Sequence, residues 1–221
     1  MKHFPIFLAV EGRHIVVSGG GEAALAKLRL LMKTEGNLTV FAEDVAPEVE
    51  MLGAEGKLAI VRRALQAGDA KGAALFYAAN DDDIEDARVT ALAQADHALT
   101  NWVDNLEHSQ FITPAIVDRD PVTVAIGTDG AAPVLARAIK AEREARLPTS
   151  LGLVARVGKA FREPVGMAPL GMHALELFRG TRSSFRGYLA GPRDFAVRSS
   201  TATLPALVSF VRRDDLQHEV V

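Results

Sequence analysis

The first half of the chain alternates between short apolar runs and segments whose apolar residues recur at helical spacing. A β-branched run at 14–18 ends at three consecutive glycines, and residues 22–33 then carry Ala, Leu and Lys in an amphipathic helical pattern. After Gly36, a plausible helix C-cap, residues 38–42 form a second apolar run. This order predicts strand, glycine turn, helix and strand, a βαβ unit whose parallel strands need a crossover helix.

The same alternation continues to about residue 113. It predicts further strands at 58–61, 73–79 and 98–103, and a helix at 84–94. Strands separated by helices predict an α/β domain with an open parallel sheet covered on both faces. We expect this domain to end near Thr113-Pro114.

The pattern changes after Pro114. Apolar residues at 115–117 and 122–126 flank the polar stretch 118–121, which predicts a strand, a turn and a strand. A helix is expected from Pro133 to about Arg146, and another beyond Pro148 to about residue 160. Frequent Gly and Pro residues then predict only short elements, and the pattern assigns no element to residues 190–221.

Gly19, Gly21 and Ala24 have the spacing of a dinucleotide-binding motif, directly after a predicted strand and at the start of a predicted helix. In such a motif the first glycine permits a tight turn, the second lets a pyrophosphate approach the backbone, and the third small residue permits close helix–strand packing. The phosphates are then expected at the helix N-terminus, where free N–H groups favour an anion. The alternative interpretation is a tight glycine loop with no ligand.

Acidic and amide residues follow two other predicted strands. Glu43 and Asp44 come after the second strand, where a carboxylate accepts hydrogen bonds from the adenosine ribose and repels a 2′-phosphate, which predicts NAD rather than NADP. Asn80 and the acids 81–83 follow another strand, at the end where open α/β sheets present ligand contacts. These acids also suit the N-terminal turn of a helix, and both interpretations are compatible.

Composition narrows the chemistry. The chain has 221 residues and no cysteine, which excludes disulfides, thiolate nucleophiles and cysteine-bound metals. Its net charge of −3 combines an acidic part, residues 1–130, with a basic part, residues 131–221. The basic part either attracts an anionic ligand or pairs with the acidic part. Its basic residues are scattered without aromatic neighbours, so we expect no nucleic-acid partner. We find no signal peptide and no membrane-spanning run, and expect a cytoplasmic protein.

Several segments resemble one enzyme family in order and spacing. They are 4–8, 12–13, 19–27, 78–82, 101–104, 111–119, 121, 124–126 and 133–137. Together they are similar to the precorrin-2 dehydrogenase and sirohydrochlorin ferrochelatase family, the dehydrogenase and chelatase module of sirohaem synthase. The resemblance covers about residues 1–160. No second glycine-rich methyltransferase module follows, so we expect a free-standing module or a fragment of one.

The resemblance implies a fold and an activity. The fold is a Rossmann NAD-binding domain at 1–113, a small dimerisation segment at 114–147 and a C-terminal helical region at 148–221, assembled as a homodimer with the active site between domains and subunits. The activity is oxidation of precorrin-2 to sirohydrochlorin with NAD. Many members also insert ferrous iron.

The resemblance also implies roles for single residues. Asp104 matches the key acid of the family and is the expected catalytic residue, because a carboxylate beside the bound macrocycle serves as a general base. The expected cofactor-binding residues are Gly19, Gly20, Gly21, Glu22, Ala23, Glu43, Asp44 and Asn80. The expected substrate-binding residues are Asn101, Arg119, Thr128 and Arg137.

Precorrin-2 carries eight carboxylates, so its binding requires an electropositive surface, and Arg119, Arg137, Lys140 and Arg143 are near one another in sequence. His108 and His173 are candidate iron ligands or proton carriers, but the sequence has no paired metal signature, and we expect no resident metal.

The sequence departs from the family at three positions. Asn80 stands where Thr or Ser is usual, Thr128 where Ser is usual, and Asp129 where Gly is usual. Asp129 adds negative charge near the expected anionic substrate, which opposes substrate binding and chelation more than NAD binding. Two rival functions stay open: another small Rossmann oxidoreductase, and a catalytically inactive NAD-binding protein.

Overall fold

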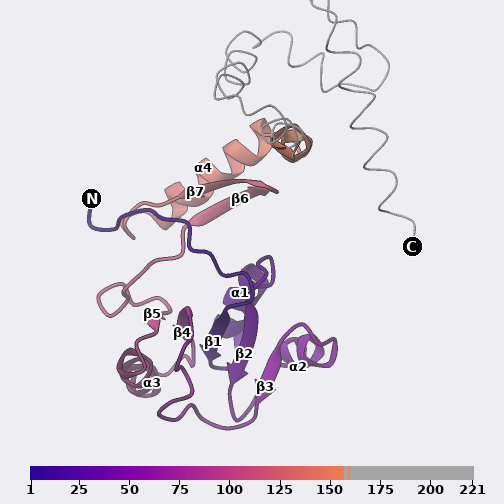
Figure 1. Ribbon diagram of the computed structural model, residues 1–221. Coiled ribbons are helices and arrows are strands. Elements are labelled where there is room, and N and C mark those ends of the chain that lie inside the picture. The colour runs from indigo at the N-terminus through magenta and orange to yellow at the C-terminus, as the bar shows by residue number, and fades with distance from the viewer. Residues whose placement is uncertain (157–158, 160–221) are drawn as a thin grey trace, which may run out of the picture. The chain divides into compact units, whose positions relative to one another are not determined.

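The computed structural model describes residues 1–156 and residue 159. The chain forms two compact units: the first combines residues 1–114 with 127–136, and the second combines 115–126 with the described residues from 137 onward. The first unit is built on a parallel sheet and the second on a two-stranded hairpin and a helix (Figure 1). The strands are β1 (His14–Ser18), β2 (Asn37–Phe41), β3 (Ala59–Val61), β4 (Leu75–Ala78), β5 (Leu99–Trp102), β6 (Ala115–Arg119) and β7 (Val122–Ile126). The helices with assigned bounds are α1 (Glu22–Leu31), α2 (Pro47–Ala54), α3 (Asp83–Ala95) and α4 (Pro133–Arg146).

Five parallel strands form the sheet of the first unit in the order β3-β2-β1-β4-β5. The chain runs outward from β1 through β2 to β3, and then returns to the other side of β1 for β4 and β5. The strand order therefore reverses between β1 and β4. In open α/β sheets, ligands bind outside the carboxyl ends of the strands at such a switch point.

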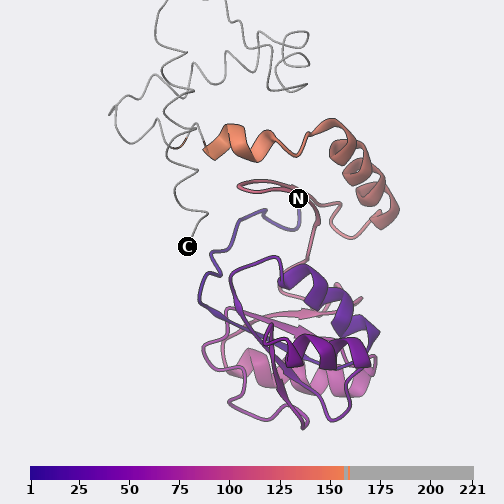
Figure 2. The ribbon, with the colours of Figure 1, turned by 90° about the vertical axis from the view of Figure 1, so that its right-hand side faces the viewer.

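Each face of this sheet has its own hydrophobic core, because successive strand residues point to opposite faces. Ile15 and Val17 of β1 pack with residues of α1 and α2, including Leu25 and Leu28. Val16 faces the other way and packs with residues of α3 and with the segment that precedes β4. Helices thus cover both faces, as Figures 1 and 2 show from two directions, and the predicted α/β fold with a parallel sheet is confirmed.

The second unit contains an antiparallel hairpin in which Arg119 pairs with Val122, so that only Asp120 and Pro121 form the turn. The sequence pattern placed Asp118 and Arg119 in the turn; the structure extends β6 through both. Arg119 explains the difference, because its guanidinium donates to the carbonyls of Glu144 and Leu147 at the end of α4. That anchor holds the end of β6 in place.

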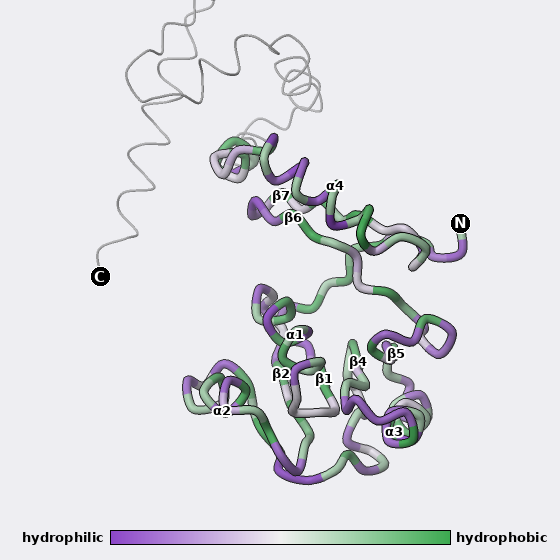
Figure 3. Tube along the Cα trace, turned by 180° about the vertical axis from the view of Figure 1, so that it is seen from behind, coloured by the Kyte–Doolittle hydropathy of each residue, from purple (hydrophilic) through white to green (hydrophobic). Residues whose placement is uncertain are grey.

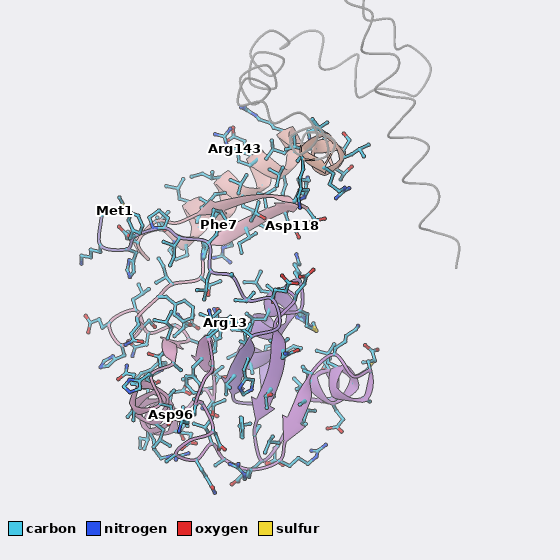
Figure 4. All side chains as sticks on the ribbon, viewed as in Figure 1. Met1, Phe7, Arg13, Asp96, Asp118 and Arg143 are labelled. Atoms are coloured by element: carbon cyan, nitrogen blue, oxygen red, sulfur yellow. The ribbon has the colours of Figure 1, made fainter. Side chains whose placement is uncertain are left out.

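The predicted elements 14–18, 122–126 and 133–146 match the structure residue for residue, and the other predicted strands and the helices α1 and α3 differ from their predictions by a few residues at their ends. Helix α2 was not singled out in the sequence. Residues 151–156 are helical, as expected beyond Pro148, whereas residues 160–221, with His173, lie outside the described residues. Along α4 hydrophilic and hydrophobic stretches alternate (Figure 3), and Arg143 extends from it (Figure 4). Among the described residues, no helix is long and apolar enough to cross a membrane.

Candidate functional site

The parallel strands bring most of the predicted site residues to one edge of the sheet. Gly19 follows β1, Glu43 follows β2, Asn80 follows β4 and Asp104 follows β5. The carboxyl ends of parallel strands share an edge, so residues separated by as many as 85 positions in the sequence are gathered there. The strand order places Gly19 and Asn80 on adjacent strands at the switch point.

The glycine turn is held by backbone contacts on both sides. Gly19 has a φ of +121°, and a Cβ there would lie 2.1 Å from the carbonyl oxygen of Ala79. A Cβ on Gly20 would lie 2.2 Å from the carbonyl oxygen of Asp44. The Gly20 carbonyl also accepts a hydrogen bond of 2.8 Å from the backbone N–H of Ala46. Packing of the protein itself therefore requires glycine at positions 19 and 20.

Gly21 is different, because the protein does not restrict it. Its φ is −86°, and, apart from its chain neighbours, the only atom of the described residues within 4 Å of an added Cβ is Oδ2 of Asp81, at 3.9 Å. It is the N-cap of α1, and no side chain caps that helix. The first N–H groups of α1 are consequently open to an anion, and the lack of a Cβ at Gly21 leaves the approach clear. This geometry fits the pyrophosphate of a dinucleotide.

Glu22 and Ala23 form the first turn of α1. Glu22 is exposed, whereas Ala23 is partly buried and packs against the core on that face of the sheet. Both supply backbone N–H groups to the open helix N-terminus, and neither side chain crosses the approach that Gly21 leaves. Glu43 and Asp44 are both exposed and lie beyond the end of β2, next to the glycine turn.

Asn80 is fixed by a hydrogen-bond network across the switch point. Its backbone N–H and its Nδ2 both donate to Oδ1 of Asp86, at 3.0 and 2.6 Å. Its side chain also contacts the hydroxyl of Ser18, at 3.3 and 3.4 Å. Burial raises the pKa of the Asp86 carboxyl, and the hydrogen bonds from Asn80 partly oppose that shift. The network ties the end of β4 to the end of β1.

The acidic residues that follow Asn80 have different roles. Asp82 is the N-cap of α3, and its carboxylate accepts from the backbone N–H groups of Ile84 and Glu85. The helix-capping interpretation therefore holds for Asp82. Asp81 has a φ of +56° and is exposed, and its carboxylate is the side chain closest to the space above Gly21.

Asp104 lies in a tight turn directly after β5. The backbone N–H of Asn105 donates to the carbonyl of Trp102 at 3.1 Å, and Asp104 has a φ of +62°. Few residues other than glycine adopt this conformation, and such positions concentrate at functional sites. The carboxylate is exposed and has no hydrogen-bond or ion-pair partner within the described part of the chain. The turn thus presents an uncommitted carboxylate at the ligand edge of the sheet.

Side chains hold the segment after this turn against the free edge of β5. The Ser109 hydroxyl accepts from the N–H of Trp102 and Oε1 of Gln110 accepts from the N–H of Thr100. Asn101, an expected substrate-binding residue, is buried, and its Nδ2 donates 2.8 Å to the carbonyl of Phe111. Its observed contacts therefore hold the segment that follows Asp104.

Comparison with known proteins agrees with this geometry. Residues 6–115 match a family described as "Putative NAD(P)-binding". The chain is 41% identical over 165 residues to the sirohaem synthase of Chromobacterium violaceum and 43% identical over 166 residues to that of Ectopseudomonas mendocina. The predicted relationship to sirohaem synthase is therefore confirmed.

The matches to sirohaem synthase cover only part of the relatives' length. Each covers 75% of this chain but 35% of the relative, so the chain spans about a third of the length of the sirohaem synthases it matches. Among solved structures, a precorrin-2 dehydrogenase aligns with a TM-score of 0.63 at 20% sequence identity, covering 96% of this chain and 99% of that one. This likeness supports the fold.

Thr128, an expected substrate-binding residue, and its neighbour Asp129 come after the parallel sheet in the sequence. The Thr128 hydroxyl accepts from the backbone N–H of Ala132, which stabilises the turn before α4. Asp129 accepts from the Lys2 backbone N–H and from Nδ1 of His3, and this His3 hydrogen bond is the main cause that lowers the pKa of Asp129. The charge that distinguishes Asp129 from the family pattern is therefore paired with the N-terminal segment.

The expected basic residues of the second unit differ in whether their charged groups already have partners within the protein. All three guanidinium nitrogens of Arg119 donate to backbone carbonyls, so its observed role is to hold the end of α4. Lys140 pairs with Glu144. Arg137 is exposed and has no ion-pair partner among the described residues.

Sequence reasoning missed Ser18 and Asp86, which fix Asn80, and gave Asp81 no role of its own. The signal in the sequence for Asp86 was an acid one helical turn beyond the N-cap candidate Asp82, on the same face of the helix; its burial is seen only in the structure. No group of three or more metal-ligating side chains occurs in the described part of the chain.

Proposed function

We propose that this chain catalyses the NAD-dependent oxidation of precorrin-2 to sirohydrochlorin, a step of sirohaem biosynthesis. The observation that carries the proposal is the uncommitted carboxylate of Asp104, held at the same sheet edge as the glycine turn in a relative of sirohaem synthase. The conformation of Asp104 is costly for a residue with a side chain, so a function that needs a carboxylate there accounts for it.

The cofactor assignment rests on the residues at the switch point. In our proposal the backbone of Gly21, Glu22 and Ala23 holds the pyrophosphate, and Gly19 and Gly20 shape the turn. Glu43 and Asp44 accept hydrogen bonds from the adenosine ribose and disfavour a 2′-phosphate, which selects NAD. Asn80, fixed by Asp86, contacts the part of the cofactor that lies across the switch point.

The chemistry divides between cofactor and protein. Oxidation of precorrin-2 removes two electrons and two protons, as one hydride and one proton. NAD, when bound, supplies the hydride acceptor. Asp104 takes the proton from the macrocycle as a general base, and its exposure leaves it accessible to a bulky substrate. Asn101 acts indirectly, because it holds the segment that follows Asp104.

The substrate carries many carboxylates, and its recognition requires positive charge. We propose Arg137 as the main contributor, because its guanidinium is exposed and not engaged in an ion pair in the described residues. Arg119 supports α4, which carries Arg137, and Thr128 shapes the turn before that helix.

We also propose a cytoplasmic homodimer that accepts ferrous iron as a second substrate. Val134 and Leu135 are 72% and 53% exposed at the start of α4, which supports an apolar contact between copies. For iron insertion, Asp104 would accept the pyrrole protons that the metal displaces, so the same carboxylate serves both reactions.

Anaerobic incubation with precorrin-2 and NAD tests the proposal. We expect the absorbance of sirohydrochlorin and of NADH to appear together, and the sirohydrochlorin absorbance to decline when ferrous iron is added. Binding of NAD without turnover of precorrin-2 would instead support a catalytically inactive NAD-binding protein. Turnover of a small hydroxy acid would support another Rossmann oxidoreductase.

A further inference from the structure

A cavity lies in the first unit, away from the glycine turn. Its volume is about 480 Å³, within the usual range for small-molecule sites, and it lies between α3 and residues 107–110. Gln110 reaches along the free edge of β5, where its backbone N–H donates 2.8 Å to the carbonyl of Thr100. The cavity therefore borders the face and the outer edge of the sheet.

Hydrogen bonds fix the orientation of two glutamine amides that line this cavity. The backbone N–H of Thr100 donates to Oε1 of Gln110 at 3.1 Å, so the amide of Gln110 must present its oxygen there. The Thr100 hydroxyl donates to the same oxygen at 3.3 Å and accepts from Nε2 of Gln94 at 3.2 Å. The other atom of each amide, Nε2 of Gln110 and Oε1 of Gln94, has no hydrogen-bond partner among the described residues. The Gln110 side of the cavity thus offers a hydrogen-bond donor, and the Gln94 side offers an acceptor.

Two further polar groups lack partners at this cavity. Oδ1 of Asn105 accepts from the backbone N–H of His108 and lies 3.0 Å from Nδ1 of that ring, so Nδ1 donates to it and Nε2 of His108 has no partner among the described residues. The buried hydroxyl of Thr90, a lining residue, has no hydrogen-bond partner in the described structure. An unpaired buried polar group is rare and calls for a water or a ligand nearby.

The charge of the lining selects among ligand classes. Among the described residues, no Lys or Arg lines the cavity, and Glu107 contributes a carboxylate. Phosphates and carboxylates are therefore disfavoured, which separates this cavity from sites for a dinucleotide or for precorrin-2. Trp102 and His108 supply aromatic surface, with ring centroids 5.1 Å apart. Aromatic surface favours a planar ring.

We propose that this cavity binds a neutral planar molecule with a donor and an acceptor side by side, the edge of a carboxamide or a nucleobase. The ligand's acceptor pairs with Nε2 of Gln110, its donor pairs with Oε1 of Gln94, and its ring lies near Trp102 and His108. The proposal does not rest on the dehydrogenase activity, although Gln110 also holds the segment that follows Asp104.

Trp102 is the single tryptophan of the chain, so its indole N–H gives one NMR signal that reports on the cavity. We expect nicotinamide to shift this signal saturably with a dissociation constant on the order of millimolar, as its small size allows. Nicotinate has the same ring but lacks the donor and carries a negative charge. It should bind at least tenfold more weakly.

Gln110→Glu is a matched variant, because the new carboxylate still accepts from the Thr100 N–H but replaces the free donor with an acceptor. We expect it to abolish the nicotinamide-induced shift and to leave NAD affinity unchanged. Ala91→Phe, which fills the cavity from α3, should do the same. Ile84→Ala is the control, since Ile84 is 84% exposed on α3 and does not line the cavity.

Three outcomes would overturn the proposal: no saturable shift, equal binding of nicotinate, or a shift that survives Gln110→Glu and Ala91→Phe. A shift that survives both variants but disappears when saturating NAD is added would assign the binding to the dinucleotide site. A shift that persists with saturating NAD and is lost in both variants supports the cavity.

Discussion

The turn after β1 and the turn after β5 lie on the same edge of one sheet but are stabilised in opposite ways. The β1 turn is enclosed by backbone: Gly19 lies against the carbonyl of Ala79, and Gly20 lies against that of Asp44. The β5 turn is held by side chains, chiefly those of Asn101 and Gln110, and has a strained residue at its tip. The first turn leaves an open surface of backbone N–H groups, which suits a cofactor. The second displays one side chain, which suits a reacting group.

The largest effect is expected at the tip of the β5 turn. Asp104→Ala should lower the rate of precorrin-2 oxidation by about 10²–10⁴-fold, the usual loss for a positioned base, and leave NAD affinity within a few fold. Single-turnover kinetics and NAD titration of the same preparation measure the two quantities. Near-normal oxidation by a folded variant would remove the central residue of the proposed mechanism.

Asp104→Asn is the matched control, because asparagine tolerates a positive φ better than alanine does. Both variants should lose oxidation, but only the alanine variant should lose stability, by about 1 kcal/mol. If iron insertion fails in both variants, one carboxylate serves both reactions. If it persists, chelation uses another group.

The enclosed β1 turn should respond to substitution by losing stability. Gly19→Ala combines a positive φ with a Cβ 2.1 Å from a backbone oxygen, and we expect a loss of roughly 3 kcal/mol in the free energy of unfolding. Urea unfolding monitored by circular dichroism measures it. A fully stable Gly19→Ala protein would mean that the turn is less closely packed than described.

Gly21 separates the ligand requirement from the packing requirement within the same turn. Gly21→Leu adds a side chain to open space, so Tm should change little, while NAD affinity should fall at least tenfold, which equals about 1.4 kcal/mol. Isothermal titration with NAD and thermal unfolding without NAD are compared for the two glycine variants. Loss of folding in Gly21→Leu would favour a tight loop without a ligand.

The sequence was sufficient wherever a local pattern determined the structure. The β-branched run before Gly19 and the helical spacing after Gly21 predicted the first βαβ unit, and Asp104 and Asn80 were located at strand ends by order alone. The sequence could not reveal contacts between distant residues. Arg119 is hydrogen-bonded to residues 25 and 28 positions further along the chain, at the end of α4. Asp129 is paired with His3, which lies 126 positions earlier.

Cofactor selectivity should give a smaller effect. Glu43 and Asp44 are exposed, so solvent screens their repulsion of a 2′-phosphate. We expect NAD to bind several-fold more tightly than NADP, and Glu43→Gln combined with Asp44→Asn to reduce that preference. Titrations at low and high salt test this, since the preference should narrow as salt rises. Equal affinity for both cofactors in the unmodified protein would contradict the assignment of these acids.

The smallest expected effect is a pH dependence from Asp86. Burial raises the pKa of this carboxyl in the folded protein, so the folded state holds its proton more tightly than the unfolded state does. Stability from this group is therefore present at low pH and is lost as the pH rises from the ordinary aspartate pKa through the raised one. Asp86→Asn retains an acceptor for Asn80 but does not titrate. Its Tm relative to the unmodified protein should rise between pH 4 and pH 7. A Tm difference that stays constant or falls over this range would mean that hydrogen bonds from Asn80 outweigh the cost of burying the charge.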